Sequence, residues 1–484
     1  MIYKKNPFRI FSLPLIVVFG LALTISPENW DLAFWALLSL VVALLPLSRF
    51  LTTRQMSHLC LFIPTIMTWL YFLGPYLYEN LPTHSYRVIP YDHLPDMAMY
   101  SALSICALVL GFYSIFRRST GRPISSLNFQ LSRPALGRVA LIMIAFGVLS
   151  RGIDYYLSWV LGPFGQLFQI IDFAPVLAIC AGLLYYLRGG RELVILVPVS
   201  TYFFLEILLR VSETLFSKII YIIAGMIIIY ILERKKIPWM VIALTFVLVF
   251  PVFNSRMLFR MEAHNRWYGL AGAEKLGITE LIGKGGGYLM QSYSFSDWDN
   301  LGASVETQAS SRFENISYLG QCVYLVKDQA KPLKYGETFW WLPLTPVPRA
   351  IFPWKPPNYH ATLLAEEYGC KGLFSKAAMN FPMLVEMFIN FGFVGMVALS
   401  FFQGGLYRWC LGKVAYGVGD LNALAFINIL WHLEKVESNI TMIFGGIFQA
   451  LITWWLLARF LKVRREEPDE TVTIGRDEIR VVGK

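Results

Sequence analysis

The chain has 484 residues, of which 56% are hydrophobic and 15% charged, and its mean hydropathy is +0.53. No soluble core can bury that much apolar sequence, so the composition excludes a soluble globular protein. The net charge of +10 comes mainly from short basic segments between apolar stretches. This pattern indicates membrane topology rather than binding of nucleic acid.

Apolar stretches recur that are long enough to cross a membrane, since one helical crossing needs roughly 17–25 apolar residues. We expect an all-α, polytopic transmembrane bundle of about twelve spans. The predicted spans are residues 8–25, 31–47, 58–78, 97–116, 136–158, 168–187, 193–209, 214–232, 237–253, 382–406, 419–436 and 440–461.

These spans divide the chain into four parts. Residues 1–253 form an N-terminal bundle of about nine spans, and residues 254–381 form a large extracytoplasmic loop with interfacial or re-entrant segments. Residues 382–461 hold the C-terminal spans, and residues 462–484 form a charged cytoplasmic tail. A second span follows the first almost at once, so we interpret the first as an uncleaved helix rather than a secretory signal.

Orientation follows from the basic residues, because Lys and Arg in short loops are retained on the cytoplasmic side. With both termini in the cytoplasm, most of them fall inside. These inner residues are Lys4, Lys5, Arg9, Arg49, Arg54, Arg117, Arg118, Arg122, Arg133, Arg138, Arg188, Arg191, Arg234, Lys235, Lys236, Arg408, Lys413, Arg464 and Arg465. The short outer loops hold little beyond Arg87, Arg151 and Arg210. The sequence therefore predicts a multi-pass protein of a bacterial cytoplasmic (inner) membrane.

Two sets of polar residues lie outside this topological pattern. Glu206, Arg210, Glu213 and Lys218 bracket the turn between the seventh and eighth spans. They are either an interfacial ion-pair cluster or a cationic shelf for an anionic lipid head group. The outer loop also contains Cys322 and Cys370, between which a disulfide is an open alternative. The other four cysteines, in or beside predicted spans, are most simply membrane-packing residues.

The outer loop is rich in arginine and aromatic residues. Arg256 and Arg260 share a helical face, and the prolines around Arg349 and Lys355 exclude a continuous helix there. A rigid segment that presents an arginine and a lysine suits a diphosphate, because Arg binds it bidentately and Lys as a point charge. The loop's tryptophans suit the apolar faces of sugar rings, although Trp is equally typical of membrane interfaces.

Several of these features resemble the bacterial oligosaccharide repeat-unit polymerases of the O-antigen and exopolysaccharide type. The resemblance covers about a quarter of the chain. It consists of the stretch Arg312-Phe313-Glu314-Asn315-Ile316, the Tyr335-Gly336 step, the run Pro348-Arg349-Ala350-Ile351-Phe352-Pro353-Trp354-Lys355-Pro356, and the span Glu386-Met387-Phe388-Ile389-Asn390-Phe391-Gly392-Phe393-Val394-Gly395. The rest of the chain matches in hydropathy and span count.

The resemblance implies a membrane-embedded glycosyltransferase of GT-C-like architecture that needs no cofactor. Its donor and acceptor would be undecaprenyl-diphosphate-linked oligosaccharides within the membrane lipid, and its product a surface polysaccharide such as the O-antigen of lipopolysaccharide. A chain-length regulator and a flippase of the same pathway would be its protein partners. We expect diphosphate binding by Arg312, Arg349, Lys355, Arg256, Arg260 and Arg210, and sugar binding by Trp340, Trp341, Trp354 and Tyr335.

The acceptor hydroxyl needs a base or an orienting acceptor. We rank Glu386 first, then Glu314, then His360, with Glu337, Glu366 and Glu367 also in reach. We expect catalysis without a metal, because fixed cations can stabilise a leaving diphosphate. Asp297 and Asp299 have the spacing of a metal-binding Asp-x-Asp pair, so that alternative stays open.

Three other functions are alternatives to polymerisation. A ligase would move finished glycan from the same lipid to another acceptor. A flippase or transporter of lipid-linked oligosaccharide would share the span count, but it would have less need of so large a loop. A scaffold in a polysaccharide export complex would use none of these residues chemically.

The predicted orientation is tested with a reporter that is active only outside the cytoplasm. We expect activity when it is fused near Lys284 or Lys331, and none when it is fused after Arg465, because basic segments stay inside. The reverse pattern would place the 254–381 loop in the cytoplasm and remove it from the outer face.

Overall fold

The computed structural model describes most of the predicted spans and part of the large loop, and the described residues form helices, turns and short connections without a strand. The described residues are 8–22, 30–53, 55–74, 93–115, 131–156, 173–212, 216–234, 236–249, 315–345, 360–370, 380–414 and 420–460, with residues 283, 287, 290, 347, 351, 352 and 354 besides. The predicted tail at 462–484 lies outside them.

Each predicted span coincides with one described helix. Those of the N-terminal part are α1 (Phe8–Ala22), α2 (Trp30–Thr53), α3 (Met56–Phe72), α4 (Leu94–Ser114), α5 (Arg133–Tyr156), α7 (Ala174–Leu187), α8 (Leu193–Ser212), α9 (Phe216–Arg234) and α10 (Trp239–Val249). Those of the C-terminal part are α16 (Met383–Val414), α17 (Asp420–Leu433) and α18 (Ile440–Phe460). The loop predicted at 254–381 contains α14 (Asn315–Lys327), the short 3₁₀ helix η8 (Leu342–Leu344) and α15 (His360–Glu367).

Five of the described helices are long and apolar enough to cross a membrane. Their spanning segments are Ala33–Thr53, Leu94–Ser114, Arg133–Gly152, Leu193–Arg210 and Met383–Gly412. The backbone of a helix satisfies its own hydrogen bonds, which is the condition for crossing hydrocarbon. The protein is therefore a multi-pass helical membrane protein.

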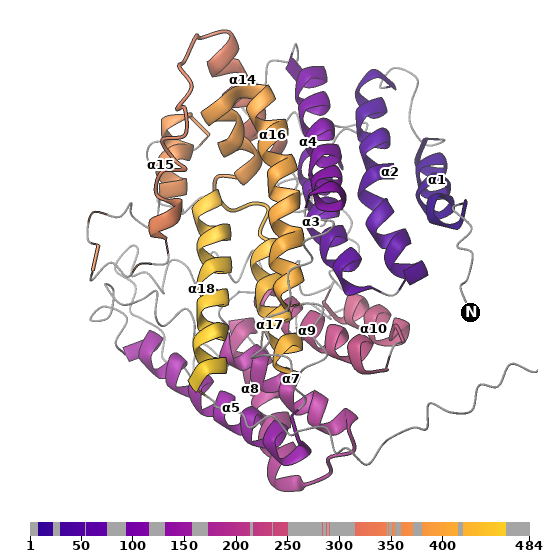
Figure 1. Ribbon diagram of the computed structural model, residues 1–484, viewed down its shortest axis with the longest axis vertical. Coiled ribbons are helices and arrows are strands. Elements are labelled where there is room, and N and C mark those ends of the chain that lie inside the picture. Colours follow the sequence, from indigo (N-terminus) through magenta and orange to yellow (C-terminus); the bar gives the residue numbers. More distant parts are fainter. Residues whose placement is uncertain are drawn as a thin grey trace, which may run out of the picture.

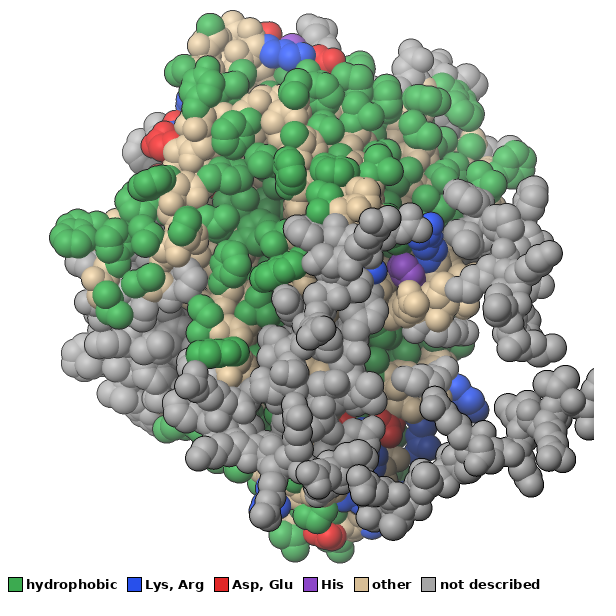
Figure 2. Space-filling view, viewed as in Figure 1, with side chains coloured by type: hydrophobic (Ala, Val, Ile, Leu, Met, Phe, Trp, Pro, Cys, Tyr) green, Lys and Arg blue, Asp and Glu red, His purple; other side chains and the backbone are tan. Residues whose placement is uncertain are grey.

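The described surface is also that of a membrane protein. Large apolar side chains are exposed along α8 and at the start of α10, among them Val194 (78%), Phe204 (69%) and Met240 (85%). Figure 2 shows hydrophobic side chains over most of the described part of one face, with charged side chains mainly near its margins. Exposed apolar area of this extent is unfavourable in water and favourable against lipid.

The helices pack in two groups (Figure 1). In the first, α4 packs along α16, with α2 and α3 beside α4 and α1 against α2. In the second, α7 packs against α5, α8 and α9. Helix α17 contacts members of both groups, including α3, α7, α9 and α16. Helix α14 contacts α3, α4 and α16, so this helix of the large loop packs on the first group, whereas η8 contacts α18.

The α4–α16 contact depends on glycines. A Cβ at Gly404 would lie 2.0 Å from the carbonyl oxygen of Leu108, and one at Gly111 would lie 1.8 Å from that of Phe401. These distances are shorter than van der Waals contact, so only glycine allows the two backbones to lie this close. Small residues serve this purpose in membrane helices, where packing replaces the hydrophobic effect between helices.

Buried ion pairs join distant parts of the second group. The Arg188 guanidinium, at the end of α7, lies 2.6 Å from Asp420 at the start of α17 and 3.3 Å from Glu233 at the end of α9. The carboxylate of Asp420 also accepts the backbone N–H of Leu131 at 2.7 Å. A buried carboxylate is costly unless it is paired and hydrogen-bonded, and Asp420 is both.

We predict that Gly404→Ala lowers the free energy of unfolding by about 1–3 kcal/mol, because the added methyl group forces α16 away from α4. The thermal unfolding midpoint of the purified protein in detergent measures the effect. Gly152→Ala in α5 is the matched control, since a Cβ there meets nothing within 4 Å. Equal midpoints for the two variants would contradict the close α4–α16 contact.

Candidate functional site

The candidate site begins at a break in α16. Gly392 has φ 67° and ψ −166°, a conformation outside the helical region that glycine tolerates. The break leaves the carbonyl groups of the preceding turn without their usual partners four residues along the helix. Those of Ile389 and Asn390 instead accept the backbone N–H groups of Lys334 at 3.0 Å and Tyr335 at 2.9 Å. The loop segment that follows α14 is thereby attached to α16.

Asn390 strengthens this attachment with its side chain, which is fully buried. Its Oδ1 accepts the backbone N–H of Gly336 at 3.0 Å, and its Nδ2 donates to the Thr338 hydroxyl at 2.8 Å and to the Glu386 carbonyl at 2.7 Å. All of the amide's polar atoms are thus used. A buried polar network whose groups are all hydrogen-bonded favours one conformation.

The Tyr335-Gly336 step forms a tight turn at this place. Both residues have positive φ, 46° for Tyr335 and 92° for Gly336. The αL conformation is unusual for a tyrosine, and the bonds to Asn390 offset its cost. A Cβ at Gly336 would approach the Phe391 ring to 3.1 Å, so the turn also has little room for a side chain.

Glu386, the first-ranked base, lies beneath this turn in the first turn of α16. Its side chain is fully buried, and its Oε2 accepts the backbone N–H of Ile440 at 2.7 Å. Ile440 is the first residue of α18, where N–H groups lack helical partners and the helix dipole favours negative charge. Glu386 therefore joins the start of α16 to the start of α18, and this contact uses one of its two oxygens.

Charged and titratable side chains from the segment around the turn and from α15 lie near one another. We refer to this group, which consists of Lys331, Lys334, Glu337, His360 and Glu367, as the Lys334 cluster. The Lys334 ammonium lies 3.1 Å from Glu367 and 3.3 Å from Glu337. Lys331 donates to the backbone carbonyl of Glu367 at 2.9 Å. These contacts attach the C-terminal end of α15 to the segment that leaves α14.

Two members of the cluster have shifted pKa values. Burial lowers the pKa of His360, and the nearby Lys334 ammonium lowers it further, against the opposing effect of Glu337 and Glu367. The imidazole is therefore neutral near pH 7. Burial opposes the charge of Lys334, but its bonds to Glu367 and Glu337 outweigh this and raise its pKa. The Nε2 of His360 is buried and has no hydrogen-bond partner among the described residues.

Aromatic side chains project from the same segment. Tyr335, Trp340 and Trp354 are 78%, 72% and 75% exposed. Trp341 is half-buried, and its ring lies 6.4 Å from that of Phe352, which contacts the Trp354 ring edge-on at 5.6 Å. All four residues expected to bind sugar thus lie on this part of the loop, and three of them expose most of their surface.

Several predicted site residues cannot be placed relative to this cluster. Arg256, Arg260, Arg312, Glu314, Arg349 and Lys355 lie outside the described residues, as do Asp297 and Asp299. Within the described part of the chain, no group of three or more His, Cys, Asp or Glu side chains is placed to hold a metal ion.

Arg210, which we expect in the diphosphate site, forms a buried ion pair in the structure. Its guanidinium is 2% exposed and lies 3.1 Å from the fully buried Glu206, which also pairs with Arg151 at 3.0 Å. Arg210 belongs to α8, which packs on α5, α7 and α9. A buried arginine in an apolar helix is held by a carboxylate of the same helix group.

Sequence reasoning missed Lys331, Lys334 and Asn390. A signal for two of them was present: Lys334 directly precedes the Tyr335-Gly336 step, and Asn390 follows Glu386 by one helical turn. Polar residues at i and i+4 on an otherwise apolar helix share a face, and such a face in a membrane helix indicates a specific contact.

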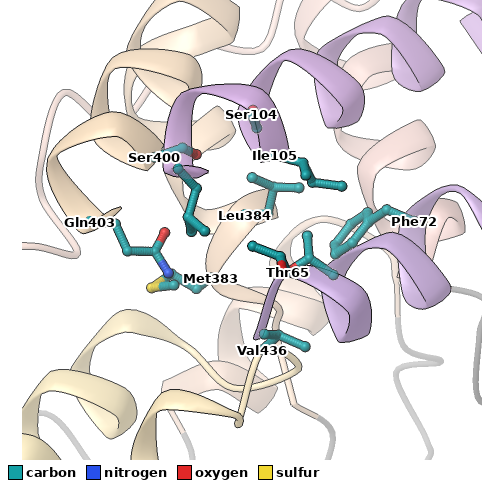
Figure 3. A pocket seen from close by; sticks show the side chains of 11 residues that line it. Thr65, Phe72, Ser104, Ile105, Met383, Leu384, Ser400, Gln403 and Val436 are labelled. Carbon is teal, nitrogen blue, oxygen red and sulfur yellow. The ribbon is translucent and has the colours of Figure 1, made fainter. Parts of the chain in front are cut away.

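A pocket lies between α3, α4 and α16 (Figure 3). Its lining is mainly apolar and includes no charged residue. Two of its hydroxyl groups donate to carbonyls of their own helices, Thr65 to Leu61 at 2.9 Å and Ser400 to Met396 at 2.8 Å. This pocket suits an apolar group rather than a diphosphate.

We predict that Glu386→Ala lowers the free energy of unfolding by about 1–3 kcal/mol, because the Ile440 N–H loses its acceptor while it remains buried. Glu386→Gln is the matched control, since its side-chain carbonyl still accepts this hydrogen bond. Thermal unfolding of the purified variants compares them. An unchanged midpoint for Glu386→Ala would show that the bond between α16 and α18 contributes no stability.

Comparison with known proteins identifies no relative of this chain. No family model matches it, and no curated protein or solved structure matches it significantly. The function is therefore argued from the residues of the sequence and from the geometry of the site.

Proposed function

We propose that this protein polymerises oligosaccharide repeat units carried on undecaprenyl diphosphate, at the outer face of the bacterial inner membrane. The observation that carries the proposal is the Lys334 cluster: the neutral imidazole of His360, whose Nε2 has no partner among the described residues, lies within electrostatic reach of Lys334, and exposed aromatic rings project from the segment that begins at Lys334. Base, cation and sugar-stacking surface are the groups that glycosyl transfer from a diphosphate requires.

The proposed topology has about twelve spans with both termini inside, in a GT-C-like bundle. Contacts between described residues support it, because they join segments assigned to the same side. Arg188 and Asp420, which pair at 2.6 Å, are both assigned to the inner side. Lys327 and Asp96, which pair at 2.6 Å, are both assigned to the outer side.

In the proposed reaction, a hydroxyl oxygen of the acceptor unit attacks the anomeric carbon of the donor's first sugar. The bond from that carbon to the diphosphate oxygen breaks, and the electron pair leaves with undecaprenyl diphosphate. The acceptor hydroxyl proton passes to a base. Arg312, Arg349 and Lys355, supported by Arg256 and Arg260, stabilise the leaving diphosphate, because fixed cations do so without a metal ion.

We assign the base to His360 in preference to Glu386. The imidazole of His360 is neutral near pH 7 and its Nε2 has no hydrogen-bond partner among the described residues, so it can accept a proton. The Oε1 of Glu386 likewise has no partner among the described residues, but Glu386 is fully buried and its Oε2 is bonded to Ile440, which suits a residue that positions the starts of α16 and α18. Tyr335, Trp340 and Trp354 then hold the sugars by stacking.

The experiment that tests the function is the surface glycan of a strain that lacks the gene. We expect single repeat units on the lipid anchor, because flipping and transfer to the final acceptor would continue without polymerisation. The readout is the glycan ladder on a gel, with re-expression of the gene as the control. Lipid-linked long chains would identify a ligase instead, and accumulation on the cytoplasmic face would identify a flippase.

We also predict opposite results for two conservative substitutions in the complemented strain. His360→Gln removes the proton acceptor and should reduce polymer by about 10²-fold or more, the usual contribution of a general base. Glu386→Gln keeps the bond to Ile440 and should retain polymer. Both are compared at equal protein level in the membrane. Loss of polymer with Glu386→Gln alone would return the role of base to Glu386.

A further inference from the structure

Two cysteines of the large loop lie in contact. Cys322 is in α14 and fully buried, and Cys370 follows the end of α15 and is partly exposed. Cys370 packs against the buried side chains that include Cys322, and its thiol is among the groups that raise the pKa of Cys322, after burial. The residues just before them also face each other, since a Cβ at Gly369 would lie 3.4 Å from the Gln321 side-chain nitrogen.

Non-covalent contacts already hold the two thiols in this place. The Lys331 ammonium lies 3.8 Å from the centre of the Tyr368 ring and donates to the Glu367 carbonyl at 2.9 Å. These bonds attach the end of α15 to the segment that follows α14. These contacts bring the two cysteines near each other without a covalent bond, and a disulfide forms where the Cβ atoms of two cysteines are close and face each other.

We propose that Cys322 and Cys370 form a disulfide that joins α14 to the end of α15. The Cys370 thiolate, the more exposed of the two, attacks a disulfide of a thiol–disulfide oxidant and forms a mixed disulfide. The Cys322 thiolate then displaces the oxidant. Two thiols lose two protons and two electrons in all, and the oxidant is reduced to its dithiol.

The bond would enclose the candidate site. The Lys334 cluster and the exposed aromatic residues Tyr335, Trp340 and Trp354 all lie in sequence between the two cysteines. Closing this segment into one loop reduces the freedom of its unfolded forms. The other four cysteines, Cys60, Cys106, Cys180 and Cys410, belong to α3, α4, α7 and α16 of the bundle. The inference rests on the proposed outer location of the loop, where disulfides persist, and not on polymerase activity.

The test is differential thiol labelling in cells. Cells are quenched in acid, denatured and treated with light N-ethylmaleimide, then reduced and treated with the heavy reagent, and peptides are measured by mass spectrometry. We expect the heavy label on both Cys322 and Cys370 and the light label on Cys60 and Cys180. Light label on Cys322 and Cys370 would overturn the disulfide.

A second measurement separates the disulfide from the topology on which it rests. In spheroplasts, a membrane-impermeant maleimide should label Cys370 of the wild type only after reduction, and Cys370 of Cys322→Ala without reduction. Labelling of wild-type Cys370 before reduction would overturn the disulfide while it confirms the outer location. If Cys370 of the Cys322→Ala variant is labelled only after the membrane is opened, both the outer location of the loop and the disulfide would be overturned. Neither measurement depends on polymer, so failure of the proposed function is read separately, from the glycan ladder.

Discussion

The candidate site depends on one break in one helix. Because Gly392 leaves the helical conformation, the carbonyl groups of Ile389 and Asn390 become acceptors for the backbone of Lys334 and Tyr335. A continuous helix would have used these carbonyls internally and left the loop without a partner. In a membrane protein such irregular backbone is tolerated where it is buried in protein. The break thus gives the start of α16 two backbone acceptors that support the loop.

The charged groups on the two sides of the Tyr335-Gly336 turn differ in burial and therefore in their roles. Beneath the turn, Glu386 is buried and bonded to the first N–H of α18, so its carboxylate contributes to the position of two helices. Above the turn, Lys334, Glu337 and Glu367 form ion pairs that are partly exposed to solvent. Exposed pairs contribute little stability, but they attach the end of α15, which begins with His360, to Lys334, the residue that precedes the exposed Tyr335. The buried network gives the site its geometry, and the partly exposed cluster supplies groups that can react or bind.

The bundle beneath the site shows how a membrane protein packs without the hydrophobic effect between its helices. Gly111 and Gly404 allow α4 and α16 to touch backbone to backbone, and this close contact supplies the dispersion energy that burial would supply in water. Arg188, Asp420 and Glu233 join α7, α17 and α9 at their ends. Polar groups of this kind connect helices that are distant in sequence. Together they hold α16 at the level where its break can meet the loop.

The sequence by itself determined the class of protein and the positions of the twelve helices that overlap the predicted spans, because these depend on local properties: apolar run length and basic flanks. The Tyr335-Gly336 step and the Glu386 span were also visible as motifs. Only the tertiary structure decided that Asn390 binds this step, that Glu386 bonds to Ile440, that Arg210 pairs with Glu206, and that Lys334 lies within electrostatic reach of His360. Each of these contacts joins residues that are far apart in the sequence or that share one buried helix face. Its energy depends on the distance between the groups and on their burial. Neither quantity is encoded in composition or spacing, so the fold was predictable where the roles of individual charged residues were not.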